Sequence, residues 1–142
     1  IAKFVARYNE HYTPKVDALT ATAAPYDAFY LLAYATAALG EEPITGTKLG
    51  RAIGRIVPPG VPIDVGAGGI YQALSVLRSG QNIDLQGTTT TLDFDRETGE
   101  PTADFAVFCL KGGQKGAPVE AVESGISFIA RNGKLTGTRS CP

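Results

Sequence analysis

The spacing of apolar residues changes once along this chain, and the change limits the folds that the chain can adopt. Up to Leu77, apolar residues recur mostly every three or four positions, which is the period of one helix face. Beyond Ile83 they recur at every second position, which is the period of a half-buried strand. The sequence therefore predicts an α/β fold in which helices come first and antiparallel strands follow.

Prolines and glycines mark the ends of four expected helices. The second helix is the clearest, because Pro25 suits the first helical turn and Gly40 suits the position after the last turn. This helix is apolar almost all round, so we expect it to be buried between other elements. Thr47 is the expected N-cap of the third helix. The four helices are expected at residues 1–12, 25–39, 48–57 and 70–79.

Segments of alternating polarity predict the strands. A short extended piece and a glycine-rich turn at residues 62–69 precede three strands, which are expected at residues 89–95, 105–110 and 126–130. Asn132-Gly133 is the strongest hairpin-turn pattern in the chain. The two periods together predict a set of buried apolar side chains, namely Phe29 or Leu32, Leu74, Leu77, Phe94, Val107 and Phe128.

The chain has two cysteines, Cys109 and Cys141. An even number of cysteines in an extracytoplasmic protein permits one disulfide. Cys109 lies on one expected antiparallel strand and Cys141 follows another, so we predict that the two lie within disulfide reach, with Cα atoms less than ~7 Å apart. The alternative is a buried free thiol at Cys109 and an incidental cysteine near the end of the sequence.

Charge and hydropathy exclude two classes of function. The net charge is −1, and no part of the sequence collects lysine and arginine. Nucleic acid, which is bound mainly through its phosphates, is therefore not an expected partner. No apolar run approaches the ~20 residues that a membrane-spanning helix needs. The length of 142 residues fits about one globular domain.

No residue pattern supports catalysis, a metal site or a cofactor site. His11 is the only histidine, no serine lies in a Gly-x-Ser-x-Gly turn, and the two cysteines lack zinc spacing. The glycines at residues 66–69 lack the Lys-Ser/Thr ending of a phosphate-binding loop, and they are interpreted as a turn. Asp93 and Asp95 share a strand face, where acid–base chemistry is conceivable, but solvated carboxylates are the commoner case there. We expect a non-catalytic protein.

Several short motifs, taken in order, resemble the type I periplasmic binding proteins of the branched-chain amino-acid type. The first is Pro25-Tyr26-Asp27-Ala28, followed by an alanine-rich helix. The second is Ile83-Asp84-Leu85-Gln86-Gly87 after a helix and a glycine, and the third runs from Leu92 through a turn at Gly99 to Phe108. The resemblance covers residues 1–111. The chain departs from the family at residues 66–69 and again beyond Lys111.

The resemblance implies the C-terminal part of a two-lobed fold that closes like a hinge on a small ligand. Residues 1–111 would belong to the ligand-binding domain, and residues 112–142 would form a strand-hairpin extension. Ile1 already lies within a helical pattern, so we expect upstream residues that supply the N-terminal lobe as the partner of this part. The implied location is periplasmic or extracellular, either free or anchored as a lipoprotein.

The function implied by the resemblance is delivery of an amino acid or a similar small polar ligand to the permease of a bacterial ABC transporter. Tyr26 would face the cleft between the lobes and contact the ligand, although plain packing of this side chain is an alternative. Asp27 would bind a ligand ammonium, or would simply stabilise the first turn of its own helix. Two other functions stay open: a ligand-sensing receptor ectodomain of the same fold and, more remotely, an α/β enzyme.

Overall fold

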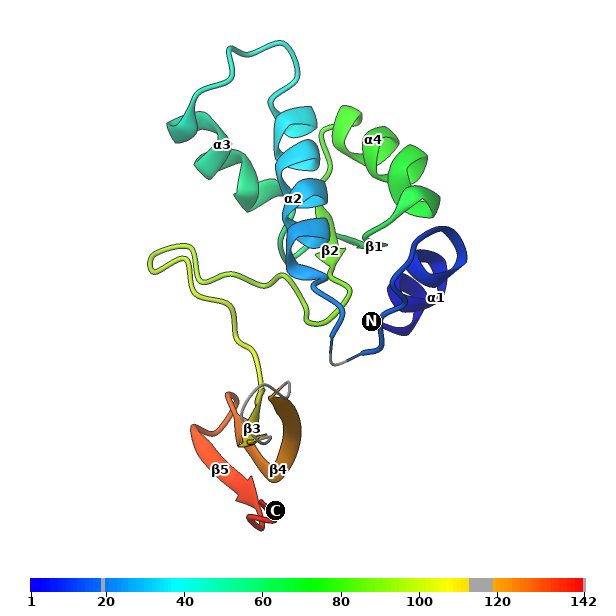
Figure 1. Cartoon of the computed structure of the whole chain (residues 1–142). Helices are drawn as coiled ribbons and strands as arrows, with labels where there is room; N and C mark the ends of the chain where they lie inside the picture. Colours follow the sequence, from blue (N-terminus) through cyan, green and yellow to red (C-terminus); the bar gives the residue numbers. More distant parts are fainter. Residues whose placement is uncertain (19, 113–118, 142) are drawn as a thin grey trace. The chain divides into compact units, whose positions relative to one another are not determined.

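The computed structural model describes residues 1–18, 20–112 and 119–141 of a mixed α/β chain (Figure 1). The chain divides into two compact units, Ile1–Pro101 and Thr102–Pro142. The division expected from the sequence was at Lys111, which is the last residue of strand β3 (Phe105–Lys111). Because β3 pairs with the strands that follow it, the boundary moves upstream to Pro101.

A two-stranded parallel sheet lies at the centre of the first unit. Strand β1 (Val61–Asp64) pairs with strand β2 (Ile83–Gln86), with Ile63 opposite Leu85. Parallel neighbours need a crossover connection, and this one runs through the 3₁₀ turn η2 (Ala67–Gly69) and helix α4 (Ile70–Arg78). The expectation that all strands would be antiparallel and would follow the helices is therefore wrong for this pair.

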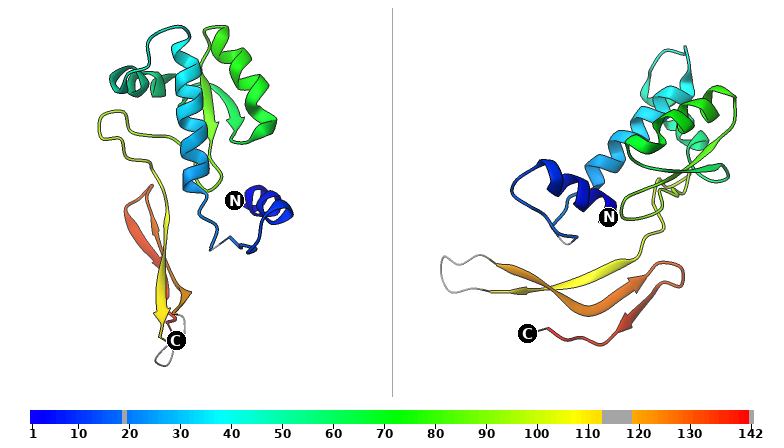
Figure 2. Two further views of the ribbon diagram at one scale, coloured as in Figure 1. Left: turned by 45° about the horizontal axis from the view of Figure 1, so that its top comes forward. Right: turned by 90° about the vertical axis from the view of Figure 1, so that its right-hand side faces the viewer.

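Three further helices belong to the first unit: α1 (Ala2–His11), α2 (Ala24–Leu39) and α3 (Gly46–Ala52), which continues into the 3₁₀ turn η1 (Ile53–Arg55). Helix α2 lies between α3 and α4 (Figures 1 and 2). It ends directly before Gly40, as predicted. The N-cap of α3 is Thr45 rather than Thr47, because the Thr45 hydroxyl accepts from the backbone N–H of Lys48 at 3.3 Å.

The core of the first unit forms between α2, α4 and the two strands. Its most buried members are Tyr34, Ala35, Ile56, Ile63, Ala73, Leu77, Ile83 and Leu85. Leu77 is buried as predicted, and Leu74 and Phe94 are half-buried. Phe29 and Leu32, one of which was expected in the core, are 66% and 53% exposed. Helix α2 is apolar on every side, so its sequence could not show which face would be covered.

One arginine binds the ends of the two core helices. The Arg55 guanidinium donates to the carbonyl oxygen of Ala38 at 3.0 Å, of Leu77 at 3.1 Å and of Gln81 at 2.9 Å. Carbonyls in the last turn of a helix have no donor within that helix. Arg55 therefore supplies a donor to the last turn of α2, adds one at the end of α4 and joins the C-terminal ends of the two helices.

The prediction of a strand at residues 89–95 is wrong. Between β2 and β3 the structure has only two isolated bridges, from Gln86 to Thr91 and from Phe94 to Pro101. A carboxylate oxygen of Asp95 accepts from the backbone N–H groups of Glu97 at 2.8 Å and Thr98 at 2.9 Å. The hydrogen bond from Thr98, and then that from Glu97, lower the pKa of Asp95. This local turn competes with strand pairing, which explains why the alternating pattern forms no strand.

The second unit is an antiparallel sheet in the order β3-β4-β5 (Figure 2). Strand β4 (Glu120–Ile129) turns at Asn132 and Gly133 into β5 (Lys134–Gly137), as the hairpin pattern predicts. Phe128 is half-buried, whereas Val107 is exposed, so the prediction that Val107 is buried is wrong. None of the described helices covers this sheet within its own unit.

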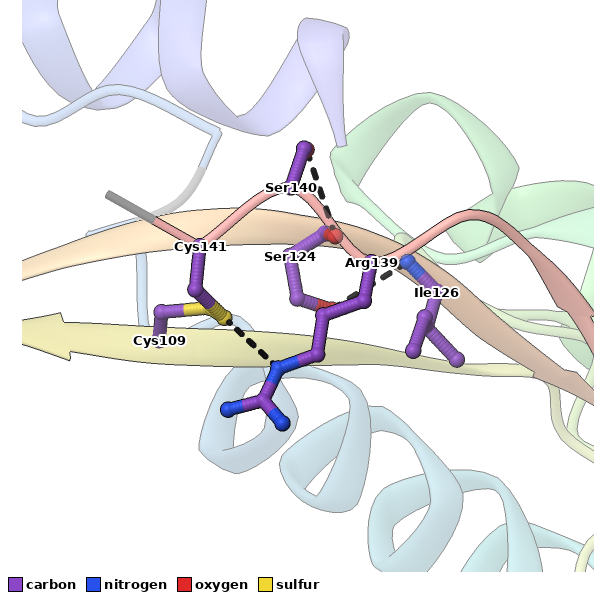
Figure 3. Close-up of a disulfide and its surroundings, with 6 residues drawn as sticks. All are labelled: Cys109, Ser124, Ile126, Arg139, Ser140 and Cys141. Carbon is purple, nitrogen blue, oxygen red and sulfur yellow. Dashed lines mark hydrogen bonds between the residues drawn. A yellow bond between two sulfur atoms is a disulfide. The ribbon is translucent and has the colours of Figure 1, made fainter.

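A disulfide joins Cys109 to Cys141, with their Cα atoms 5.8 Å apart (Figure 3). This confirms the prediction that the two cysteines lie within disulfide distance. Cys109 lies opposite Val122 in the β3–β4 pair. Beyond β5, the backbone N–H of Ser140 donates to the carbonyl oxygen of Ser124 at 2.8 Å, so this segment continues along β4. The disulfide therefore crosses β4 and holds the last described residues to the far strand.

Within the described part of the chain, no helix is long and apolar enough to cross a lipid bilayer.

We predict that removing the disulfide destabilises the second unit. The bond closes a loop over a sequence separation of 32 residues, and loop-closure entropy for that length is worth about 3–4 kcal/mol. Amide hydrogen exchange on a Cys109→Ser/Cys141→Ser variant should show faster exchange in β4. Amides of α2 and α4 serve as the internal control and should keep their protection. Unchanged exchange in β4 would contradict this prediction.

Candidate functional site

The two parallel strands end at the same edge of their sheet, and a hollow of about 1290 Å³ opens there. Ligands of open α/β sheets bind outside the carboxyl ends of the strands. The last residue of each strand and the two residues after it line this hollow, which we call the strand-end hollow. They are Asp64, Val65 and Gly66 at the end of β1, and Gln86, Gly87 and Thr88 at the end of β2. Every lining residue belongs to the first unit.

Residues of helix α1 also line the strand-end hollow, and Figure 1 shows this helix near β1. Positions three or four apart on a helix share a face, and Phe4, Arg7, Tyr8 and His11 all line the hollow. The Lys3 ammonium lies 2.8 Å from a carboxylate oxygen of Asp64, just at the end of β1. Both partners are largely exposed, so this ion pair is worth no more than about 1 kcal/mol.

Aromatic rings connect α1 to α2. Phe4 meets Tyr26 edge-on, with ring centroids 5.1 Å apart. The series extends along α1 from Phe4 to Tyr8 at 6.0 Å, and along α2 from Tyr26 to Tyr30 at 5.0 Å. Edge-to-face pairs at such distances contribute about 0.5–1.5 kcal/mol each beyond the area they bury. The contact between Phe4 and Tyr26 is thus the main apolar attachment of α1 beside the hollow.

Tyr26 lines the strand-end hollow, where the family resemblance expected a cleft-facing aromatic residue. Its hydroxyl lies over Gly66, because a Cβ built on Gly66 would be 3.3 Å from Tyr26 Oη and 3.7 Å from Arg7 Nη1. Gly66 has a φ of +128°, which side-chain-bearing residues rarely adopt. The missing side chain leaves room for the guanidinium and the hydroxyl to converge.

Together with burial, the hydroxyl of Tyr26 also raises the pKa of Tyr30, one turn further along α2. Burial first, and then the neighbouring Tyr26 hydroxyl, raise the pKa of Tyr30 to about 12. Burial likewise raises the pKa of Tyr34, one turn further along. Both phenols therefore stay protonated at neutral pH, and neither can serve there as a phenolate base.

Asp27 does not line the hollow, and its carboxylate is already engaged. The residue is 4% exposed. The backbone N–H of Thr88 donates to Oδ1 at 3.1 Å and to Oδ2 at 2.9 Å, and the Thr88 hydroxyl donates to Oδ2 at 2.9 Å. The ammonium-binding role expected for Asp27 is replaced by a structural one. The carboxylate binds the loop after β2 to the first turn of α2.

Sequence reasoning missed the residues of α1 and of the strand ends. Nothing in the sequence distinguishes Arg7 from a solvated arginine on an amphipathic helix. Asp64 and Thr88 could have been found by treating residues 61–64 and 83–86 as a parallel pair, since the residues after such strands meet at one edge. Within the described ranges, no three His, Cys, Asp or Glu side chains are grouped so that they could hold a metal ion.

Comparisons of the chain with protein-family models, with curated proteins and with solved structures found no match.

We predict that Asp27→Asn lowers the free energy of unfolding by about 1.5–3 kcal/mol, which is typical of hydrogen bonds to a charged group. The amide can replace only one of the two oxygens that accept from Thr88. Urea unfolding followed by circular dichroism measures this loss. Glu41→Gln, at an exposed position just beyond α2, removes the same charge and should change stability by less than ~0.5 kcal/mol. Equal losses in the two variants would show that Asp27 does not have this structural role.

Proposed function

We propose that this chain is part of an extracytoplasmic solute-binding protein that binds an amino acid or a similar small polar ligand for an ABC transporter. The protein acts by binding and not by catalysis. The observation that carries the proposal is the position of Tyr26, which lines a hollow at the carboxyl ends of two parallel strands. That is where the resembled family places an aromatic residue in contact with its ligand.

The size and composition of the strand-end hollow support this proposal. Small-ligand sites usually occupy roughly 300–1,000 Å³, and they combine apolar walls with a few convergent polar groups. Here Phe4 and Tyr8 supply the apolar wall, and Arg7, Tyr26 and Gln86 supply polar groups. The hollow exceeds the usual volume, which fits a cleft that a second lobe of the same protein narrows when it closes.

The disulfide supports the proposed location. Structural disulfides persist in oxidising compartments such as the periplasm and the extracellular space. Cys109 and Cys141 are paired, and the part of the chain that the structure describes contains no free cysteine. A solute-binding protein outside the cytoplasm, with a membrane permease as its partner, would meet those conditions.

Tyr26→Ala in the full-length protein tests the proposal. A thermal-shift screen of amino acids and other small carboxylates selects the ligand, and calorimetry then compares its affinity for the variant and the parent. We expect affinity to fall about tenfold or more, or about 1.4 kcal/mol, because the ligand loses an aromatic face and a hydroxyl.

Tyr71→Ala is the matched control, since Tyr71 is 88% exposed on α4 and does not line the hollow. Its affinity for the same ligand should equal that of the parent. Unchanged affinity in a folded Tyr26→Ala variant would refute the proposal, as would a screen in which no amino acid and no other small carboxylate raises the melting temperature.

A further inference from the structure

Among the described side chains that line the strand-end hollow, one cation has no charged partner. Lys3 is paired with Asp64 at 2.8 Å. His11 lies beside Glu10, with 3.9 Å between Nε2 and a carboxylate oxygen. Arg7 makes no hydrogen bond and no ion pair with any residue that the structure describes, although its guanidinium lines the hollow. The hollow therefore presents an unpaired guanidinium.

Two donors of the hollow converge on one place. Arg7 Nη1 and Tyr26 Oη lie 3.7 Å and 3.3 Å from the point where a Cβ of Gly66 would stand. Because both atoms lie within 4 Å of that point, the guanidinium and the phenol are close enough to donate to the two oxygens of one carboxylate, and hydrogen bonds to an ionised acceptor are the strong ones. Glycine at position 66 adds no side chain beside these two donors.

The lining offers no comparable place for a ligand cation. Asp64 is the one acidic residue among the lining residues that the structure describes, and the Lys3 ammonium already binds it. Asp27, which could have bound an ammonium, is buried against Thr88. Two lysine or arginine side chains against one carboxylate leave the described lining with one surplus positive charge.

Resting on the function proposed above, we propose that the strand-end hollow binds a monoanionic carboxylate whose carboxylate group is held by Arg7 and Tyr26. The apolar body of this ligand lies against the rings of Phe4 and Tyr8. A single free guanidinium beside a neutral phenol matches one negative charge, whereas a phosphate dianion would leave charge unbalanced beside aromatic rings. The α-ammonium of an amino acid finds no partner in this part of the site.

Calorimetry on the full-length protein with two matched probes, 3-phenylpropanoate and the uncharged 3-phenylpropanamide, tests the proposal. The carboxylate should bind at least tenfold more tightly than the amide. In Arg7→Gln the affinity for the carboxylate should fall roughly tenfold to hundredfold, as expected for the loss of a hydrogen bond to a charged group, while the affinity for the amide stays the same. Tyr26→Phe should lower the affinity for the carboxylate by a smaller factor than Arg7→Gln does.

Arg78→Gln is the charge-matched control, because Arg78 ends α4, is exposed and does not line the hollow. It should leave both affinities unchanged. The proposal is overturned if the parent protein binds the two probes equally, if Arg7→Gln weakens both by the same factor, or if neither probe binds. In each case, the proposed solute-binding function would still stand if another ligand binds with an affinity that depends on Tyr26.

Discussion

The carboxylate of Asp27 is the contact on which the strand-end hollow depends. A buried carboxylate is costly unless hydrogen bonds satisfy it, and here the backbone N–H and the hydroxyl of Thr88 both do so. Gly87 leaves the space for this approach, since a Cβ there would be only 2.9 Å from Oδ2 of Asp27. An acidic residue in the first turn also interacts favourably with the helix dipole. The loop after β2 is thereby fixed to the start of α2, and Tyr26, the preceding residue, is directed over Gly66 at the end of β1.

The two walls of the hollow are held with unequal strength. The strand ends are joined to α2 by buried hydrogen bonds. Helix α1 has no buried residue, and it is attached through the ring of Phe4, an exposed ion pair between Lys3 and Asp64, and a hydrogen bond from the Ile1 ammonium to the Thr88 carbonyl oxygen. Elements with few buried contacts open most easily, and ligand sites are commonly built from them. A ligand that bridges Arg7 on α1 and Tyr26 on α2 would bind only when α1 is in place, and it would therefore stabilise the docked position of α1 by mass action. Binding and the ordering of α1 are therefore coupled.

Local chemistry made part of this fold predictable. Pro25 and Gly40 delimited α2, Asn132-Gly133 gave the β4–β5 turn, and the strand positions brought Cys109 within reach of Cys141. The parallel pairing of β1 with β2 was not predictable, because strands of four residues are too short for their period to reveal a partner. Nor could sequence periodicity orient an all-apolar helix, which is why Phe29 was misplaced. The family resemblance pointed to Tyr26, whereas no pattern in the sequence predicts that α1 brings Arg7 beside the strand ends.

The most direct test of the account is to locate a bound carboxylate on the protein. Two-dimensional ¹H–¹⁵N spectra of the full-length protein, recorded during titration with 3-phenylpropanoate, report which amides and arginine side chains change environment. The account predicts chemical-shift changes at the backbone amides of Gly66 and Thr88 and at the Arg7 side chain. All three should follow the same titration curve and give the same dissociation constant. Shifts that saturate elsewhere, for instance on the exposed face of α2 around Phe29 or on β3, while these three resonances stay in place, would contradict it.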